Sequence, residues 1–151
     1  MGLIEFIIKA KLSGYATGSE GQKKTFDDGS FGFEFESGGY RYLDRYYGFN
    51  PFSGTEHVLD VKGSLIWKMN YYGKITGDCP DPGRIYEFLR KAMSLISPEF
   101  PFRGPAMLEK GNLHYENRQN GTLENFHGVE SIYDSGQRAY VLYYHGGKMM
   151  D

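Results

Sequence analysis

Two glutamates lie in matching runs of sequence and could carry chemistry. Glu56 belongs to the run FSGTEHV at residues 52–58, and Glu130 belongs to FHGVESI at residues 126–132. Side chains alternate between the two faces of a strand, so each glutamate shares a face with apolar residues. A carboxylate on such a face is either paired with a cation or neutral with a raised pKa. In both states it is a candidate for a functional site.

Aromatic side chains in two later runs could line the same site. A strand at residues 65–72 would place Trp67 and Tyr71 on one face, and a strand at residues 138–144 would do the same for Tyr140 and Tyr144. Their rings have an apolar body and a polar edge, which suits a flat or cationic ligand. Ordinary core packing explains the same pattern, so a purely structural role is the alternative.

Arg103 lies in the segment Pro101-Phe102-Arg103-Gly104-Pro105, which should be rigid. Its guanidinium could hold an anion or pair with a carboxylate such as that of Glu130, and the pairing is favoured. The predicted ligand-binding residues are therefore Glu56, Trp67, Tyr71, Arg103, Glu130, Tyr140 and Tyr144.

Signals for catalysis, metals and cofactors are weak. The four histidines do not have the spacing of a metal site, and Cys79 lies in a loop without a nearby histidine. No nucleophile motif or phosphate-binding glycine loop is present. The sequence therefore assigns no catalytic residue, and no cofactor or metal is expected. An enzyme would have to use Glu56 or Glu130 as acid or base, with Arg103 or His145 nearby.

Length and charge narrow the class of protein. The chain has 151 residues, which predicts a single domain over 1–151. Its net charge is −2 and it has no basic cluster, so no direct nucleic-acid binding is expected. A single cysteine favours a reducing, cytoplasmic location. No apolar run is long enough to span a membrane, and the N-terminus does not resemble a signal peptide.

Helical periodicity predicts two helices. The first covers residues 3–12, with Lys9 and Lys11 facing outward. The second begins after Asp81, a suitable N-cap, and ends before Pro98. The apolar positions expected to face the core are Ile4, Ile7 and Ile8 in the first helix and Ile85, Phe88, Leu89, Ala92, Met93 and Ile96 in the second.

Alternating side chains and glycine-rich turns predict seven strands. The high contents of aromatic residues (17%) and glycine (21 residues) suit short antiparallel strands with tight reversals. The predicted fold class is α+β in the order α-ββββ-α-βββ, with both helices packed on one side of a curved antiparallel sheet. The strands are expected near residues 31–36, 40–47, 55–61, 65–72, 113–118, 124–133 and 138–144.

An internal repeat underlies this arrangement. The two halves, about residues 3–73 and 85–146, align helix with helix and strand with strand. The pattern indicates duplication of a helix-plus-strands unit, with chance alignment of tyrosines and glycines as the alternative. The most informative matches are Asp44 with Asn117, Glu56 with Glu130, Trp67 with Tyr140, and Tyr71 with Tyr144.

Four short motifs stand out in the sequence: Tyr15-Ala16-x-Gly18, Trp67-x-Met69-Asn70-Tyr71-Tyr72-Gly73, Pro101-Phe102-Arg103-Gly104-Pro105 and His145-Gly146-Gly147. With these motifs the chain resembles a family of small bacterial and archaeal domains of unknown function, found alone or behind xre-type helix-turn-helix regulators. The resemblance implies a sensor role in some members but no established activity, and no DNA-binding segment is recognised in this chain.

These features favour a small-molecule-binding or sensor-type domain. Its cleft would lie between the pseudo-symmetric halves, with aromatic walls and both glutamates, and its ligand would be cationic or aromatic. The first alternative is an enzyme that uses a cleft glutamate as general acid or base. The second is a protein–protein interaction module with a tyrosine-rich surface, and a homodimer is compatible with the sequence.

Overall fold

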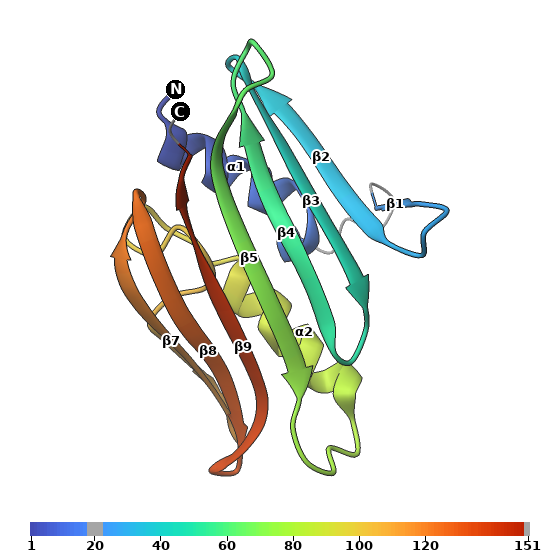
Figure 1. Cartoon of the computed structure of the whole chain (residues 1–151). Coiled ribbons are helices and arrows are strands. Elements are labelled where there is room, and N and C mark those ends of the chain that lie inside the picture. The colour runs from blue at the N-terminus through green and yellow to red at the C-terminus, as the bar shows by residue number, and fades with distance from the viewer. Residues whose placement is uncertain (18–22, 150–151) are drawn as a thin grey trace.

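The fold is one antiparallel sheet with two helices on the same face (Figure 1). The computed structural model describes residues 1–17 and 23–149, and the counts below refer to that part of the chain. The nine strands are hydrogen-bonded in the order β1-β2-β3-β4-β5-β9-β8-β7-β6. The elements are α1 (Leu3–Ser13), a 3-10 turn η1 (Tyr15–Thr17), β1 (Lys24–Thr25), β2 (Phe31–Ser37), β3 (Tyr40–Gly48), β4 (Phe52–Leu59), β5 (Leu65–Ile75), α2 (Pro82–Met93), β6 (Met107–Lys110), β7 (Leu113–Thr122), β8 (Asn125–Asp134) and β9 (Gln137–Lys148).

Each helix precedes a run of antiparallel strands whose last strand lies near the centre of the sheet. β5 closes the first run and β9 closes the second, and the two strands pair with each other. In this central pair Tyr71 lies directly opposite Tyr144. The α+β class, the two helices and the antiparallel sheet are as the sequence predicts.

The number of strands differs from the prediction. Five strands follow α1 and four follow α2, instead of four and three. The two unpredicted strands, β1 and β6, have two and four residues and are mostly exposed. Strands this short, with no buried face, show no alternation of apolar and polar residues that a sequence pattern could detect.

The second helix begins with the N-cap and the proline that the sequence predicts. The Asp81 side chain accepts a hydrogen bond from the Arg84 backbone N–H at 3.1 Å, and Pro82 occupies the first turn. This cap satisfies one of the backbone donors that a helix leaves free at its start. The apolar positions predicted to face the core are buried in α2 and just after it: Ile85, Phe88, Leu89, Ala92, Met93 and Ile96.

The first helix is rotated relative to the prediction. Ile7 is buried as expected, but Ile4 and Ile8 are only half-buried. Lys11, expected to face outward, is 4% exposed. The apolar stripe alone could not reveal this, because the position of Lys11 is set by a carboxylate on β4. The buried residues of α1 are Phe6, Ile7, Ala10 and Lys11.

The core lies between the helices and one face of the sheet. Trp67, Met69, Tyr140 and Leu142 are all fully buried there. The other face carries no helix, and Tyr72 and Tyr143 lie opposite each other on it, about half exposed. In the described part of the chain, no helix is both long and apolar enough to cross a membrane.

Candidate functional site: a cavity with an open carboxylate

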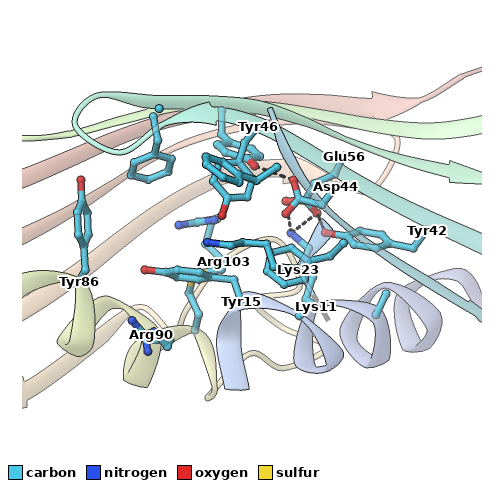
Figure 2. A pocket seen from close by; sticks show the side chains of 18 of the residues that line it. Lys11, Tyr15, Lys23, Tyr42, Asp44, Tyr46, Glu56, Tyr86, Arg90 and Arg103 are labelled. Atoms are coloured by element: carbon cyan, nitrogen blue, oxygen red, sulfur yellow. Dashed lines mark hydrogen bonds and ion pairs between the residues drawn. The ribbon is translucent and has the colours of Figure 1, made fainter. Parts of the chain in front are cut away.

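A cavity of about 280 Å³ lies between the two helices and strands β2 to β5 (Figure 2). About half of its described lining residues are aromatic, and a group of charged side chains lies at one end, with Tyr86 and Arg90 at the other. The lining residues on α1 to β2 are Ala10, Lys11, Gly14, Tyr15, Lys23, Phe31 and Phe33. Those on β3 and after it are Tyr42, Asp44, Tyr46, Gly48, Phe49, Phe52, Glu56, Tyr71, Tyr86, Arg90, Met93 and Arg103.

Glu56 is the buried carboxylate at the charged end. Its side chain accepts a hydrogen bond from the Tyr42 hydroxyl at 2.7 Å, and the Lys11 ammonium lies 2.9 Å from Oε1. Lys11 also donates to the carbonyl oxygen of Phe102. Burial lowers the pKa of the Lys11 ammonium, and the nearby Glu56 carboxylate opposes that effect. Glu56 and Lys11 therefore form a buried, mutually satisfied ion pair.

Asp44 is the second carboxylate at this end, and it lies directly opposite Glu56 on the neighbouring strand. The Tyr71 hydroxyl donates to its Oδ1 at 2.6 Å. Its Oδ2 accepts no hydrogen bond from the described residues, and the side chain is half-buried at the cavity wall. Burial, reinforced by the charge of Glu56, raises the pKa of Asp44 to about 7. Asp44 can therefore accept or release a proton near neutral pH.

Glu130 is the other carboxylate that the sequence predicts for the site, and it is fully buried. Arg103 binds both of its oxygens, with Nη2 2.8 Å from Oε1 and Nε 3.1 Å from Oε2. The hydroxyls of Tyr140 and Tyr115 also donate to it, the former at 2.9 Å. Arg103 thus makes the predicted ion pair, and Glu130 has no oxygen left for a ligand.

The two halves of the sheet repeat the same hydrogen bonds. Asp44 lies opposite Glu56 as Asn117 lies opposite Glu130. The hydroxyl of Tyr144 donates to Asn117 at 2.8 Å, just as that of Tyr71 donates to Asp44. One chemical difference between the two networks is the neutral amide of Asn117 at the position of the Asp44 carboxyl.

Arg90 marks the far end of the cavity. Its guanidinium lies over the Tyr15 ring, with 5.5 Å from Cζ to the ring centroid. Its Nε is buried and has no hydrogen-bond partner in the described part of the chain. A ligand with an acceptor atom near this end could satisfy that N–H, because an unpaired buried donor is costly.

The predicted site residues divide into two groups. Glu56, Tyr71 and Arg103 line the cavity. The others, Trp67, Glu130, Tyr140 and Tyr144, are fully or almost fully buried and do not line it. The cavity therefore lies under the first half of the sheet, whereas the sequence placed the cleft between the halves.

The sequence interpretation missed the three polar residues that surround Glu56 at the charged end, Lys11, Tyr42 and Asp44, and it also missed Arg90 at the far end. The helical pattern places Lys11 on the outer face of its helix, and alternation places Tyr42 and Asp44 in a strand with no sign of a site. The repeat contained one usable signal, since Asp44 aligns with the neutral Asn117. Asp44 is acidic where the aligned position in the other half carries an amide, and this difference distinguishes the two networks.

No metal site accompanies these residues. Within residues 1–17 and 23–149, no three His, Cys, Asp or Glu side chains are placed to hold a metal ion. The candidate site is therefore described by its carboxylates, its cations and its aromatic wall.

Comparison with known proteins places the chain in a family. The family described as a domain of unknown function (DUF5680) matches residues 44–149, which include Asp44, Glu56 and Arg103. Searches of curated proteins and of solved structures found no match. Since the match covers more than half of the sequence, the chain belongs to the DUF5680 family.

Proposed function

We propose that this protein is a small-molecule-binding domain and that its ligand occupies the cavity beside Asp44. The observation that carries the proposal is the Oδ2 atom of Asp44, which accepts no hydrogen bond from the described residues and lies at the wall of a cavity rich in aromatic side chains. Ligand sites in proteins are typically concave and mostly apolar, with a few polar groups that orient the ligand. This cavity has that composition.

The size of the cavity limits the ligand to a small compound. An apolar cavity of about 150 Å³ holds one benzene molecule. At about 280 Å³, the present cavity has room for one ring and a short side chain. The rings of Phe31, Phe33 and Phe52 line it and can pack against a flat group.

The neighbours of Asp44 favour a ligand that donates a hydrogen bond. Lys11 is already paired with Glu56, and Arg103 is paired with Glu130. These pairs neutralise two carboxylates, and no cation from residues 1–17 or 23–149 is in hydrogen-bond contact with Asp44. A ligand N–H group, above all a charged one, would supply the missing partner.

Duplication of a helix-plus-strands unit explains how such a site could arise, and it is part of this proposal. The repeated hydrogen bonds around Glu56 and Glu130 support it. One copy would keep a filled, structural network, and the other would be free to bind a ligand. A domain of this kind suits a sensor role, in which occupancy of the cavity changes its stability or its contacts.

A thermal-shift screen tests the proposal. The library contains small flat amines, amides, acids and neutral compounds, and it is applied at about pH 8, where Asp44 is ionised. Binding in the cavity should raise the melting temperature of the wild type by several degrees. Ala10 lines the cavity and is buried, so Ala10→Leu should fill part of the space and remove the shift.

Two further variants complete the screen. Glu87→Gln changes an exposed carboxyl on the outer side of α2, so it should respond to ligands like the wild type. Met93→Trp, at another lining position, replaces Ala10→Leu if that variant does not fold. The proposal fails if no compound shifts the wild type, or if the hits shift the cavity-filled variant as much as the wild type.

An enzyme is the second candidate, and Asp44 is the residue that favours it. Its pKa of about 7 is suited to general acid–base catalysis. Of the two acids or bases that the sequence suggested, Glu56 is paired with Lys11 and Tyr42, and Glu130 is paired with Arg103 and Tyr140. Mass spectrometry of each hit after incubation with wild type and with Asp44→Asn distinguishes the two functions. Conversion only by the wild type indicates catalysis, and unchanged hits indicate binding alone.

A further inference from the structure

We call strands β1 to β5 the open half of the sheet, because the cavity lies under them, and strands β6 to β9 the filled half. In the filled half, a segment of the chain occupies the position that corresponds to the cavity. The segment Phe102-Arg103-Gly104 lies over β7 and β8 and is held there by side chains of these strands. The Phe102 ring stacks on Phe126, with centroids 3.7 Å apart and planes 7° apart. The guanidinium of Arg103 binds Glu130. This segment thus places an aromatic ring and a cation on the second half of the sheet.

The backbone of Gly104 completes the attachment. Its N–H donates to the Tyr115 hydroxyl at 3.0 Å, and its carbonyl oxygen accepts from the Asn117 amide at 2.8 Å. Four side chains of β7 and β8 therefore hold the segment: Tyr115, Asn117, Phe126 and Glu130.

The counterparts of these four residues all line the cavity. Strand register defines the correspondence, since Phe52 and Phe126 each lie opposite a glycine of the next strand. Glu56 and Glu130 lie opposite Met69 and Leu142 in the same way. The four counterparts are Tyr42, Asp44, Phe52 and Glu56, and each of them lines the cavity. The cavity is therefore the place that Phe102-Arg103-Gly104 fills in the other half.

Lys11 occupies the part of the cavity that corresponds to the Arg103 guanidinium. Its ammonium binds Glu56, as the Arg103 guanidinium binds Glu130. The position of the Phe102 ring is not taken in the same way. The three rings in contact with Phe52 have centroids 6.0 to 6.5 Å away, and Phe52 is only half-buried. By contrast, Phe126 is 1% exposed under its stacked partner.

The open half has the Asp44 carboxylate where the filled half has the Asn117 amide, so the hydrogen bond to the bound group runs in the opposite direction. The Asn117 amide donates to a carbonyl oxygen. An ionised Asp44 can only accept, so the group bound at this position must be a donor. A cationic donor is favoured, because a hydrogen bond between two charged groups is stronger than a neutral one.

We infer that the ligand is an arylalkylamine: one aromatic ring that packs on Phe52, joined by a short chain to an ammonium group that donates to Asp44. This inference rests on the proposed function and specifies its ligand class. A ring with a chain of two or three atoms agrees with the cavity volume of about 280 Å³.

Isothermal titration calorimetry with three matched probes tests the ligand class. 2-Phenylethylamine, phenylacetamide and phenylacetate share the ring and differ in the charge of the end group. At about pH 8 the amine should bind the wild type about tenfold or more tightly than the amide, because a charged hydrogen bond replaces a neutral one. Phenylacetate should bind weakest, because its carboxylate is repelled by Asp44 and Glu56.

Asp44→Asn should reverse this preference, because it gives the open half the amide of the filled half. The amine should lose about tenfold or more in affinity, and phenylacetamide should bind as well as before or better. Asn117 shows that an amide fits beside a tyrosine hydroxyl at this position, so the variant should fold. Glu87→Gln, with its exposed carboxyl, should keep the wild-type order of the probes.

The pH dependence of the wild type gives a test without a variant. The groups that face Asp44 are Glu56 on β4, Tyr71 on β5, Tyr42 on β3, Lys11 on α1 and the Arg103 guanidinium. Among them, Asp44 itself should change charge near neutral pH. Amine affinity should therefore fall as the pH decreases from about 8 to about 5, and amide affinity should change less.

The outcomes separate this inference from the proposed function. Tighter binding of phenylacetate than of the amine, or full retention of amine binding by Asp44→Asn, overturns the ligand class. If none of the three probes binds, but other library compounds bind the wild type and not Ala10→Leu, only the ligand class is overturned. If no compound binds in the cavity at all, both proposals fail.

Discussion

Asp44 and Asn117 accept the same hydrogen bond, each from the tyrosine at the centre of the sheet in its own half. Tyr71 donates to Asp44 at 2.6 Å, and Tyr144 donates to Asn117 at 2.8 Å. Asn117 also binds the backbone of Gly104, whereas the second oxygen of Asp44 accepts no hydrogen bond from the described residues and borders the cavity. Under the proposed function, the carboxyl of Asp44 serves ligand binding at a position where an amide would fit.

The first prediction is that Asp44→Asn stabilises the protein at alkaline pH. The pKa of Asp44 is raised from 3.8 to about 7, so the folded state holds a proton that the unfolded state releases between these values. Wild-type stability from this group is therefore present below about pH 4 and lost as the pH rises to 7. At about pH 8 the variant should be more stable by about 2–4 kcal/mol, and near pH 4 by little.

Urea unfolding at both pH values measures this difference, with Glu87→Gln as the control. Glu87 is exposed, so its substitution should change the free energy of unfolding by less than about 0.5 kcal/mol. Equal stability of wild type and Asp44→Asn at both pH values would mean that Asp44 has an ordinary pKa.

The second prediction concerns Arg103, which is 4% exposed and pairs with Glu130. Arg103→Met should lower the free energy of unfolding by about 3–5 kcal/mol, because it leaves Glu130 buried without a cation. Arg84→Met removes an exposed ion pair with Asp134 and should cost no more than about 1 kcal/mol. Similar losses in both variants would show that the buried pair is not structural.

The third prediction concerns Gly54, which lies opposite Tyr71. A Cβ atom at this position would lie 2.5 Å from the Tyr71 hydroxyl oxygen and 2.6 Å from the carbonyl oxygen of Arg45. Gly54→Ala should therefore cost about 1–3 kcal/mol and displace the hydroxyl that binds Asp44. Amine binding should weaken with it.

Gly83→Ala is the matched control for this change. A Cβ at Gly83 would meet only the Asp81 side chain, at an ordinary contact distance of 3.5 Å. Alanine is the better helix former, so this variant should be as stable as the wild type or more stable. A neutral effect of Gly54→Ala on both stability and binding would show that Tyr71 has room to move without consequence.

Much of the fold could be predicted because its periodic signals are local. The cap at Asp81 and the apolar positions of α2 gave the second helix, and alternation gave the seven longer strands. The strands β1 and β6 are too short and too exposed to leave such a pattern. Their existence depends on pairing with a neighbour, which is a tertiary effect.

The site could be predicted only in part because it depends on contacts between distant segments. The burial of Glu56 followed from alternation along β4, but its cation comes from α1. The helical pattern placed Lys11 in solvent, and nothing near it in the sequence indicates a partner 45 residues away. The space beside Asp44 depends on which half of the sheet receives Phe102 and Arg103, and that is set by packing.

The titration of the Asp44 carboxyl tests the central claim most directly. Carbon-13 NMR of aspartate-labelled protein can follow this group from about pH 4 to 9, and the Asp44→Asn spectrum assigns its signal. The midpoint should lie near 7 in the free protein. With saturating 2-phenylethylamine it should move to lower pH, because the ammonium stabilises the ionised carboxylate. The same midpoint with and without the amine would contradict the proposed binding site.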